Sequence, residues 1–109
     1  MTAYEFGEVL LLNAYPYSDL KGVKKRPALV LADTGDEDIV VARITSESPR
    51  DAYDLLLDRW KEAGLLLPSS VRLAKVATLS KALVLKKLGK LGSPERRKIR
   101  MALSKLFSL

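Results

Sequence analysis

The sequence predicts a mainly β protein with short helices, in which the strands curl into a small barrel and an amphipathic helix follows at the C-terminal end. Short apolar runs recur along most of the 109 residues, and turn-forming residues separate them at close intervals. Helical spacing of apolar residues begins only after Gly92. A chain of this length is expected to form one domain, residues 1–109, whose small core favours sharing burial with a second copy.

The first half of the chain predicts strands separated by one long loop. Residues 6–12 are the first apolar run, and residues 13–22 follow with Pro, Gly, Asn and Asp as turn formers. The next run starts at Pro27, which has no N–H to donate and therefore suits the first residue of a strand. Residues 28–32 are apolar throughout, which predicts a strand buried on both faces. After a hairpin turn over residues 33–38, a third strand is predicted over residues 38–46.

The second half predicts further strands and then the helix. We expect a short strand around residues 55–57, a helical turn over residues 59–64, and strands over residues 71–79 and 83–91. Ser93, Pro94 and Glu95 then have the properties of an N-cap, a first helical residue and a carboxylate in the first turn. The predicted helix carries one apolar stripe, formed by Ile99, Ala102, Leu103, Leu106 and Phe107.

Composition excludes several kinds of site. The chain has no cysteine and no histidine, so disulfides, thiolate metal sites and histidine general bases are absent, and we expect no metal and no cofactor. No signal peptide or membrane-spanning run is evident, which predicts a cytoplasmic protein with no membrane partner. Residues 1–68 hold 8 Lys or Arg against 12 Asp or Glu, whereas residues 69–109 hold 11 against Glu95 alone. This polarity indicates either a polyanionic ligand or a solvated basic face.

Three features could bind a phosphate or a base, and each also has a purely structural interpretation. Arg26 precedes Pro27 at the mouth of a buried strand, where it would hold a phosphate or serve as an ordinary loop charge. Thr45 and Ser46 end an apolar strand and would donate hydrogen bonds, although threonine is also simply a good strand former. Tyr17, in the long loop, would stack on a base or pin the loop to the core.

Several segments taken together resemble the MazF/PemK-type toxins. The resemblance covers nearly the whole chain in order, although no single motif is as specific as a zinc signature. Its segments are Gly7-Glu8-Val9-Leu10-Leu11, Tyr15-Pro16-Tyr17-Ser18-Asp19-Leu20, Lys25-Arg26-Pro27-Ala28-Leu29-Val30-Leu31, Ile44-Thr45-Ser46, Ala63-Gly64-Leu65, Pro68-Ser69-Ser70-Val71-Arg72-Leu73 and Lys86-Lys87-Leu88-Gly89-Lys90-Leu91.

The resemblance implies an SH3-like barrel that forms a homodimer and pairs with an acidic antitoxin. Members of that family are metal-independent endoribonucleases, which cut single-stranded RNA by attack of the substrate's own 2′-OH and leave a cyclic phosphate and a 5′-OH. By position, Arg26, Thr45 and Ser46 are the implied catalytic residues. The implied RNA-binding residues are Lys24, Lys25, Tyr17 and Arg72.

The chain departs from the family pattern at one position. The family's arginine corresponding to Arg72 is usually followed two positions later by an aspartate, and here that position is Ala74. A non-catalytic RNA- or protein-binding module derived from the toxin fold is therefore the alternative, with a toxin acting on a non-RNA target as a third reading. Arginine side chains keep their proton near neutral pH, which makes Arg26 better suited to stabilising phosphoryl charge than to shuttling protons, although proton donation to the leaving oxygen stays open.

Overall fold

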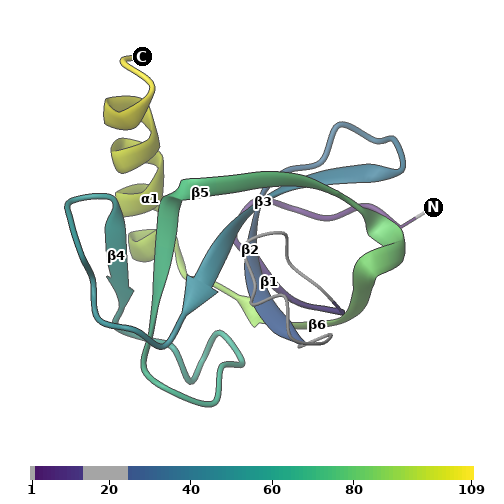
Figure 1. Cartoon of the computed structure of the whole chain (residues 1–109), viewed down its shortest axis with the longest axis horizontal. Coiled ribbons are helices and arrows are strands. Elements are labelled where there is room, and N and C mark those ends of the chain that lie inside the picture. Colours follow the sequence, from purple (N-terminus) through teal and green to yellow (C-terminus); the bar gives the residue numbers. More distant parts are fainter. Residues whose placement is uncertain (1, 14–24) are drawn as a thin grey trace.

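The structure, a computed structural model, describes residues 2–13 and 25–109. In this part of the chain, six antiparallel strands form one curled sheet, and one long helix packs at one end of it (Figure 1). The sheet has the strand order β4-β5-β3-β2-β1-β6, which leaves β4 and β6 as its edges. The elements are β1 (Glu8–Leu12), β2 (Arg26–Ala32), β3 (Asp38–Thr45), β4 (Asp54–Leu57), β5 (Ser69–Ser80), the short 3₁₀ helix η1 (Lys81–Leu83), β6 (Val84–Lys90) and α1 (Ser93–Leu106).

The prediction of a mainly β fold with a C-terminal helix is confirmed. The central strands of the curled sheet carry buried apolar side chains on both of their faces. Val9 and Leu29 belong to the cluster beneath α1, whereas Leu10 and Val30, their neighbours in sequence, belong to the cluster inside the curl. Successive strand residues point to opposite faces, so β1 and β2 must be apolar at consecutive positions. In β2 this double burial covers Ala28 to Val30, and it ends at the exposed Ala32.

Strand β5 is longer than predicted and changes its pairing along its length. Residues 69–72 pair with β4, and residues 70–72 also pair with the end of β3. Between the pairs Ala42–Val76 and Arg43–Arg72 the register shifts, so residues 73–75 form a bulge on β5. Bulges bend a strand and increase its twist. The bend lets β5 lie along β4 at one end and close over β3 at the other (Figure 1).

The C-terminal helix covers one face of the sheet through the predicted stripe, with two corrections. Ile99 is fully buried, and Ala102, Leu103 and Leu106 pack against the same core. Phe107 instead is the C-cap and is 57% exposed, because the helix ends at Leu106. The predicted N-cap is also wrong: Gly92 is the N-cap and Ser93 is the first helical residue, where its Oγ accepts a hydrogen bond from Arg96.

Two glycines bring the segment between β4 and β5 against β6. The predicted helical turn is present, with the Ala63 N–H donating to the Arg59 carbonyl at 3.2 Å. Gly64 has φ +85°, and a Cβ there would lie 2.1 Å from the Leu88 carbonyl oxygen. A Cβ at Gly89 would lie 2.5 Å from the Ala63 carbonyl oxygen. The two backbones therefore approach more closely than any side-chain-bearing pair allows.

Among the described residues, no helix has the length and apolar character that crossing a membrane requires.

Candidate functional site

A cavity of about 430 Å³ opens where the ends of β2 and β3 meet the segment between β4 and β5. A volume of this order is typical of sites that bind small ligands or parts of larger ones. One side carries cationic and hydroxyl side chains, and the other is formed by the leucines that follow Gly64. Its lining includes Lys25, Arg26, Thr45, Ser46, Leu65, Leu66, Leu67 and Lys86.

Arg26 is the first residue of β2, and its neighbour in the sheet is Leu12 at the end of β1. Pro27 follows it in the same strand and pairs with Leu11, so the start of β2 is held against β1. The side chain of Arg26 is half-buried, and its Nε is shielded from solvent without a hydrogen-bond partner in the described chain. A buried donor without an acceptor is costly, because it has given up water and received nothing in exchange.

Thr45 and Ser46 reach the cavity because β3 ends there. Thr45 is the last residue of β3, is buried, and pairs with Ser70 of β5. Its Oγ1 accepts a hydrogen bond of 3.2 Å from the backbone N–H of Glu47. With that lone pair in use, the hydroxyl proton stays available to donate into the cavity. Ser46 is exposed and lies on the same wall.

Lys86 is a cationic residue of the cavity that the sequence did not single out. It lies in β6, opposite Leu11 of β1, and Leu11 in turn lies opposite Pro27 of β2. Residues aligned across neighbouring strands project from the same face of a sheet. The row places Lys86 on the face of Pro27, and Lys86 lines the same cavity as Lys25 and Arg26, although 60 residues separate Lys86 from Arg26 in the sequence. Only the strand order β2-β1-β6 reveals the proximity.

Arg72 does not line this cavity. Its side chain is 5% exposed, its Nη2 donates to Glu47 Oε2 at 2.7 Å, and its Nε lies 3.6 Å from Asp54 Oδ2. Asp54 is its neighbour across β4 and β5. Ala74, the position where the family pattern has an aspartate, is exposed in the β5 bulge. Carboxylates from two other parts of the chain therefore already neutralise this guanidinium.

Arg72, Glu47, Asp54 and Arg50 form a cluster, the Arg72 cluster, whose positive charges keep its carboxylates ionised. The hydrogen bond from Arg72, together with its positive charge, lowers the pKa of Glu47 below the usual value. Burial raises the pKa of Asp54, but hydrogen bonds from Arg50 and the charges of Arg50 and Arg72 outweigh this effect and leave the pKa low. Both acids are thus acceptors near neutral pH rather than proton donors.

The remaining predicted residues differ in what the structure says of them. Lys25 is exposed and lines the cavity beside Arg26. Tyr17 and Lys24 lie outside the described residues. Within residues 2–13 and 25–109, no group of three or more acidic, histidine or cysteine side chains is arranged to hold a metal ion.

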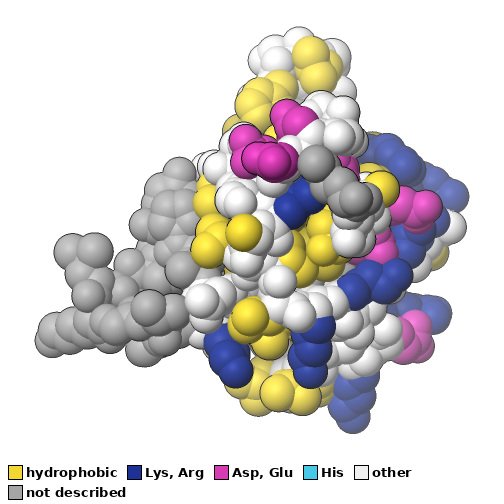
Figure 2. Space-filling view, turned by 90° about the vertical axis from the view of Figure 1, so that its right-hand side faces the viewer, with side chains coloured by type: hydrophobic (Ala, Val, Ile, Leu, Met, Phe, Trp, Pro, Cys, Tyr) yellow, Lys and Arg dark blue, Asp and Glu magenta, His cyan; other side chains and the backbone are white. Residues whose placement is uncertain are grey.

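The surface beside the site is mixed in character. Figure 2 shows one face of the molecule, on which basic side chains lie among apolar ones over the lower and right-hand parts and acidic side chains lie near the top and at the right. Leu66 is 92% exposed and Leu67 is 58% exposed, and both border the cavity. Exposed leucines next to cations form a surface suited to a ligand with anionic and apolar parts.

Comparison with solved structures shows the class of fold. The chain superimposes on a mycobacterial endoribonuclease solved with its cognate antitoxin, with a TM-score of 0.77 and 21% identity over 98% of this chain and 97% of that one. MazF from Deinococcus radiodurans gives a TM-score of 0.76 at 18% identity, covering both chains completely. The Mycobacterium tuberculosis toxin MazF-mt6 gives 0.73 at 22% identity over 92% of this chain and 97% of that one. The protein therefore has the fold of the MazF toxins.

Sequence comparison supplies the family itself. Residues 5–107 match the family of PemK-like, MazF-like toxins of type II toxin–antitoxin systems. No curated protein sequence matches the chain significantly. Because the family match spans nearly all of the chain, the protein belongs to the PemK/MazF toxin family.

Proposed function

We propose that this protein is the toxin of a type II toxin–antitoxin pair and that it cleaves single-stranded RNA in the cavity beside Arg26. The observation that carries the proposal is the convergence of Lys25, Arg26 and Lys86 with the hydroxyls of Thr45 and Ser46 on one cavity. Arg26 lines this cavity, and a guanidinium is the kind of donor that binds a phosphate well. Family membership and the endoribonucleases among the structural relatives support the same reaction.

The proposed step is a transesterification within the RNA. The 2′-oxygen forms a bond to the adjacent phosphorus, the bond from phosphorus to the 5′-oxygen breaks, and the products are a 2′,3′-cyclic phosphate and a 5′-OH. The 2′-OH proton leaves to solvent, and the 5′-oxygen receives a proton from water or from Arg26. Arg26 stabilises the charge that grows on the non-bridging oxygens, and Thr45 donates its hydroxyl proton to one of them. Lys25 and Lys86 hold the flanking phosphates.

Substitution of Arg26 tests the reaction directly. Arg26→Ala is expected to slow cleavage of a labelled single-stranded RNA about 10²–10³-fold, as removal of one oxyanion donor does in other enzymes. Arg26→Lys should recover only part of the rate, because an ammonium lacks the planar, forked geometry of a guanidinium. The assay is run in EDTA, and circular dichroism establishes that each variant is folded.

Arg59→Ala is the matched control. Arg59 is also a cation, but its side chain is 68% exposed, and its ion-pair partner among the described residues is the equally exposed Glu62. Its removal should leave the rate within about twofold of wild type. Equal rates for Arg26→Ala and wild type would refute the assignment, and wild-type protein that cuts no RNA would instead favour the non-catalytic binding module.

The same proposal includes a homodimer and an acidic antitoxin as partners. The small core and the basic second half of the sequence motivate both, and relatives solved with MazE or a cognate antitoxin provide the precedent. We expect a dimer in sedimentation at micromolar concentration and antitoxin binding that weakens as salt rises. A monomer at that concentration would contradict the first expectation, and salt-independent binding would contradict the second.

A further inference from the structure

Glu47 follows the end of β3 and makes three hydrogen bonds, with Arg72, Ser70 and Thr45. Its carboxylate accepts a hydrogen bond from Arg72 Nη2 at 2.7 Å, and its backbone carbonyl accepts one from Ser70 Oγ at 3.3 Å. Its backbone N–H donates to Thr45 Oγ1 at 3.2 Å. The side chain is itself 65% exposed, so packing does not hold it in place. Its position is set by these polar contacts.

The guanidinium that contacts Glu47 is almost completely buried. Arg72 is 5% exposed, lies in β5 between strands β3 and β4, and faces Asp54, whose side chain is 1% exposed. Asp54 Oδ2 in turn accepts hydrogen bonds of 3.0 Å from both the backbone N–H and the Nε of Arg50. Arg72 Nε and Asp54 Oδ2 form an ion pair at 3.6 Å without a hydrogen bond, and the buried guanidinium donates its hydrogen bond to the exposed carboxylate of Glu47.

The contact between Glu47 and Thr45 has a chemical consequence. A threonine hydroxyl has one proton to donate and can accept in return. Because the Glu47 N–H supplies a proton to Oγ1, the hydroxyl proton of Thr45 is directed to another acceptor, and the cavity is the space that Thr45 lines. Displacing residue 47 would remove this bias and allow the hydroxyl to rotate.

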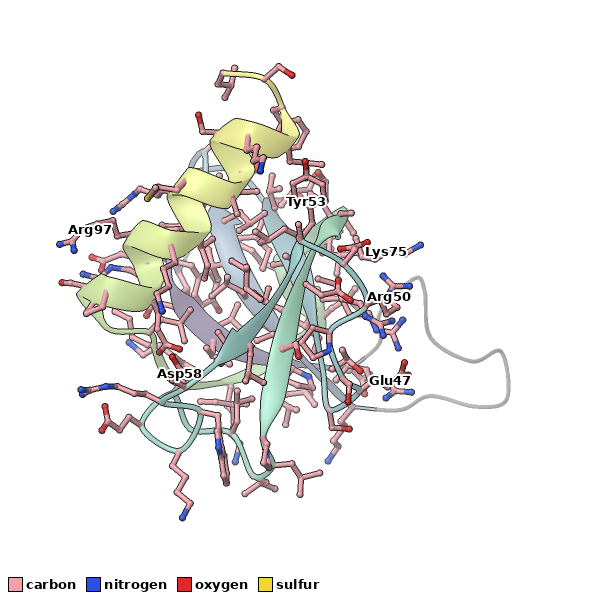
Figure 3. The ribbon with its side chains drawn as sticks, turned by 90° about the vertical axis from the view of Figure 1, so that its left-hand side faces the viewer. Glu47, Arg50, Tyr53, Asp58, Lys75 and Arg97 are labelled. Carbon is pink, nitrogen blue, oxygen red and sulfur yellow. The ribbon has the colours of Figure 1, made fainter. Side chains whose placement is uncertain are left out.

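We propose that Glu47 is a positioning residue: anchored by Arg72 and Asp54, it orients the Thr45 hydroxyl toward the phosphate in the cavity. Arg72 then acts through Glu47 and does not itself bind RNA. Figure 3 shows Glu47 and Arg50 together on one side of the molecule, away from Arg97 on α1. The catalytic part of this inference rests on the proposed function, whereas the anchoring part concerns the folded protein alone.

Steady-state kinetics separate positioning from the other roles that a carboxylate could have here. Glu47→Ala is expected to lower kcat about tenfold without raising KM, since a misplaced hydroxyl weakens the transition state. A group that binds RNA would raise KM when lost, and a carboxylate that merely repels RNA would lower KM with kcat unchanged. Glu47→Gln, whose amide oxygen can still accept from Arg72, should recover most of kcat. The matched control is Glu62→Ala, which removes an exposed carboxylate paired with an exposed arginine.

A double substitution tests whether Glu47 acts through Thr45. Thr45→Ala with Glu47→Ala should be no slower than Thr45→Ala alone, because the orienting contact has nothing left to orient. Multiplied effects of the two substitutions would overturn the proposal. So would a kcat for Glu47→Ala within about twofold of Glu62→Ala.

Amide hydrogen exchange measures the anchoring without RNA. In the wild type the residue 47 amide has Thr45 Oγ1 as its acceptor. After correction for intrinsic rates, Glu47→Ala should speed its exchange about tenfold while amides of the β3 core stay unchanged. Unchanged protection at residue 47 overturns the proposal whatever the RNA assay gives. Lost protection in a wild type that cuts no RNA would uphold the anchoring and refute the proposed function instead.

Discussion

Gly64 is the position where a single added methyl group should most disturb the wall of the cavity. Its φ of +85° is left-handed, and a Cβ would lie 2.1 Å from the carbonyl oxygen and 2.6 Å from the carbonyl carbon of Leu88. An alanine in the left-handed region costs roughly 1–2 kcal/mol. Overpacking of this kind adds about 1–3 kcal/mol. Gly64→Ala should therefore lower the free energy of unfolding by about 2–5 kcal/mol.

Substitutions at two other glycines measure the backbone cost and the overlap cost separately. Gly35 has φ +93° with nothing within 4 Å of a Cβ, so Gly35→Ala measures the backbone cost alone. Gly89 would place a Cβ 2.5 Å from the Ala63 carbonyl oxygen, and no left-handed φ is involved there, so Gly89→Ala measures the overlap alone. Urea unfolding of all three variants at one fixed protein concentration gives the three free energies.

The result for Gly64 should equal the sum of the other two within about 1 kcal/mol. Gly64→Ala should also slow RNA cleavage more than Gly35→Ala, since residues 64–67 form one wall of the cavity and Gly35 lies outside it. Equal stability of Gly64→Ala and Gly35→Ala would refute the close approach of this segment to β6.

Two further predictions concern charge. The hydrogen bond from the Tyr4 N–H is the main cause of the low pKa of Asp33 in the folded protein. The ionised Asp33 carboxylate therefore stabilises the folded state fully above the unfolded pKa of about 3.9, and this contribution is lost as pH falls through the lower folded pKa. The difference in unfolding free energy between wild type and Asp33→Asn should therefore shrink below about pH 4, and a difference that grows there would contradict this reasoning. Lys86→Ala should weaken RNA binding and reduce the slope of log affinity against log salt by about 0.7, the value for one phosphate on a single strand; an unchanged slope in filter binding would remove Lys86 from the site.

Local and periodic features of this fold could be predicted from the sequence. The consecutive apolar residues 28–32 indicated that β2 is buried on both faces, because a strand alternates its faces at every residue. The apolar stripe of α1 could be predicted from the helical period, which places residues three and four positions apart on one face. Pro27 placed Arg26 at the mouth of β2, and the end of the apolar run at Thr45 marked the end of β3. These predictions needed only neighbours along the chain.

Features that join distant segments depended on the tertiary structure. Lys86 reaches the cavity through strand order, and the roles of Arg72 depend on which strands flank β5. The family resemblance implied an RNA-binding role for Arg72, and the structure adds that Arg72 pairs with Glu47 and lies beside Asp54. The bulge at residues 73–75 and the close approach at Gly64 are likewise products of packing. Register and contact between strands are set by the whole core, because each pairing is stable only when the others are formed.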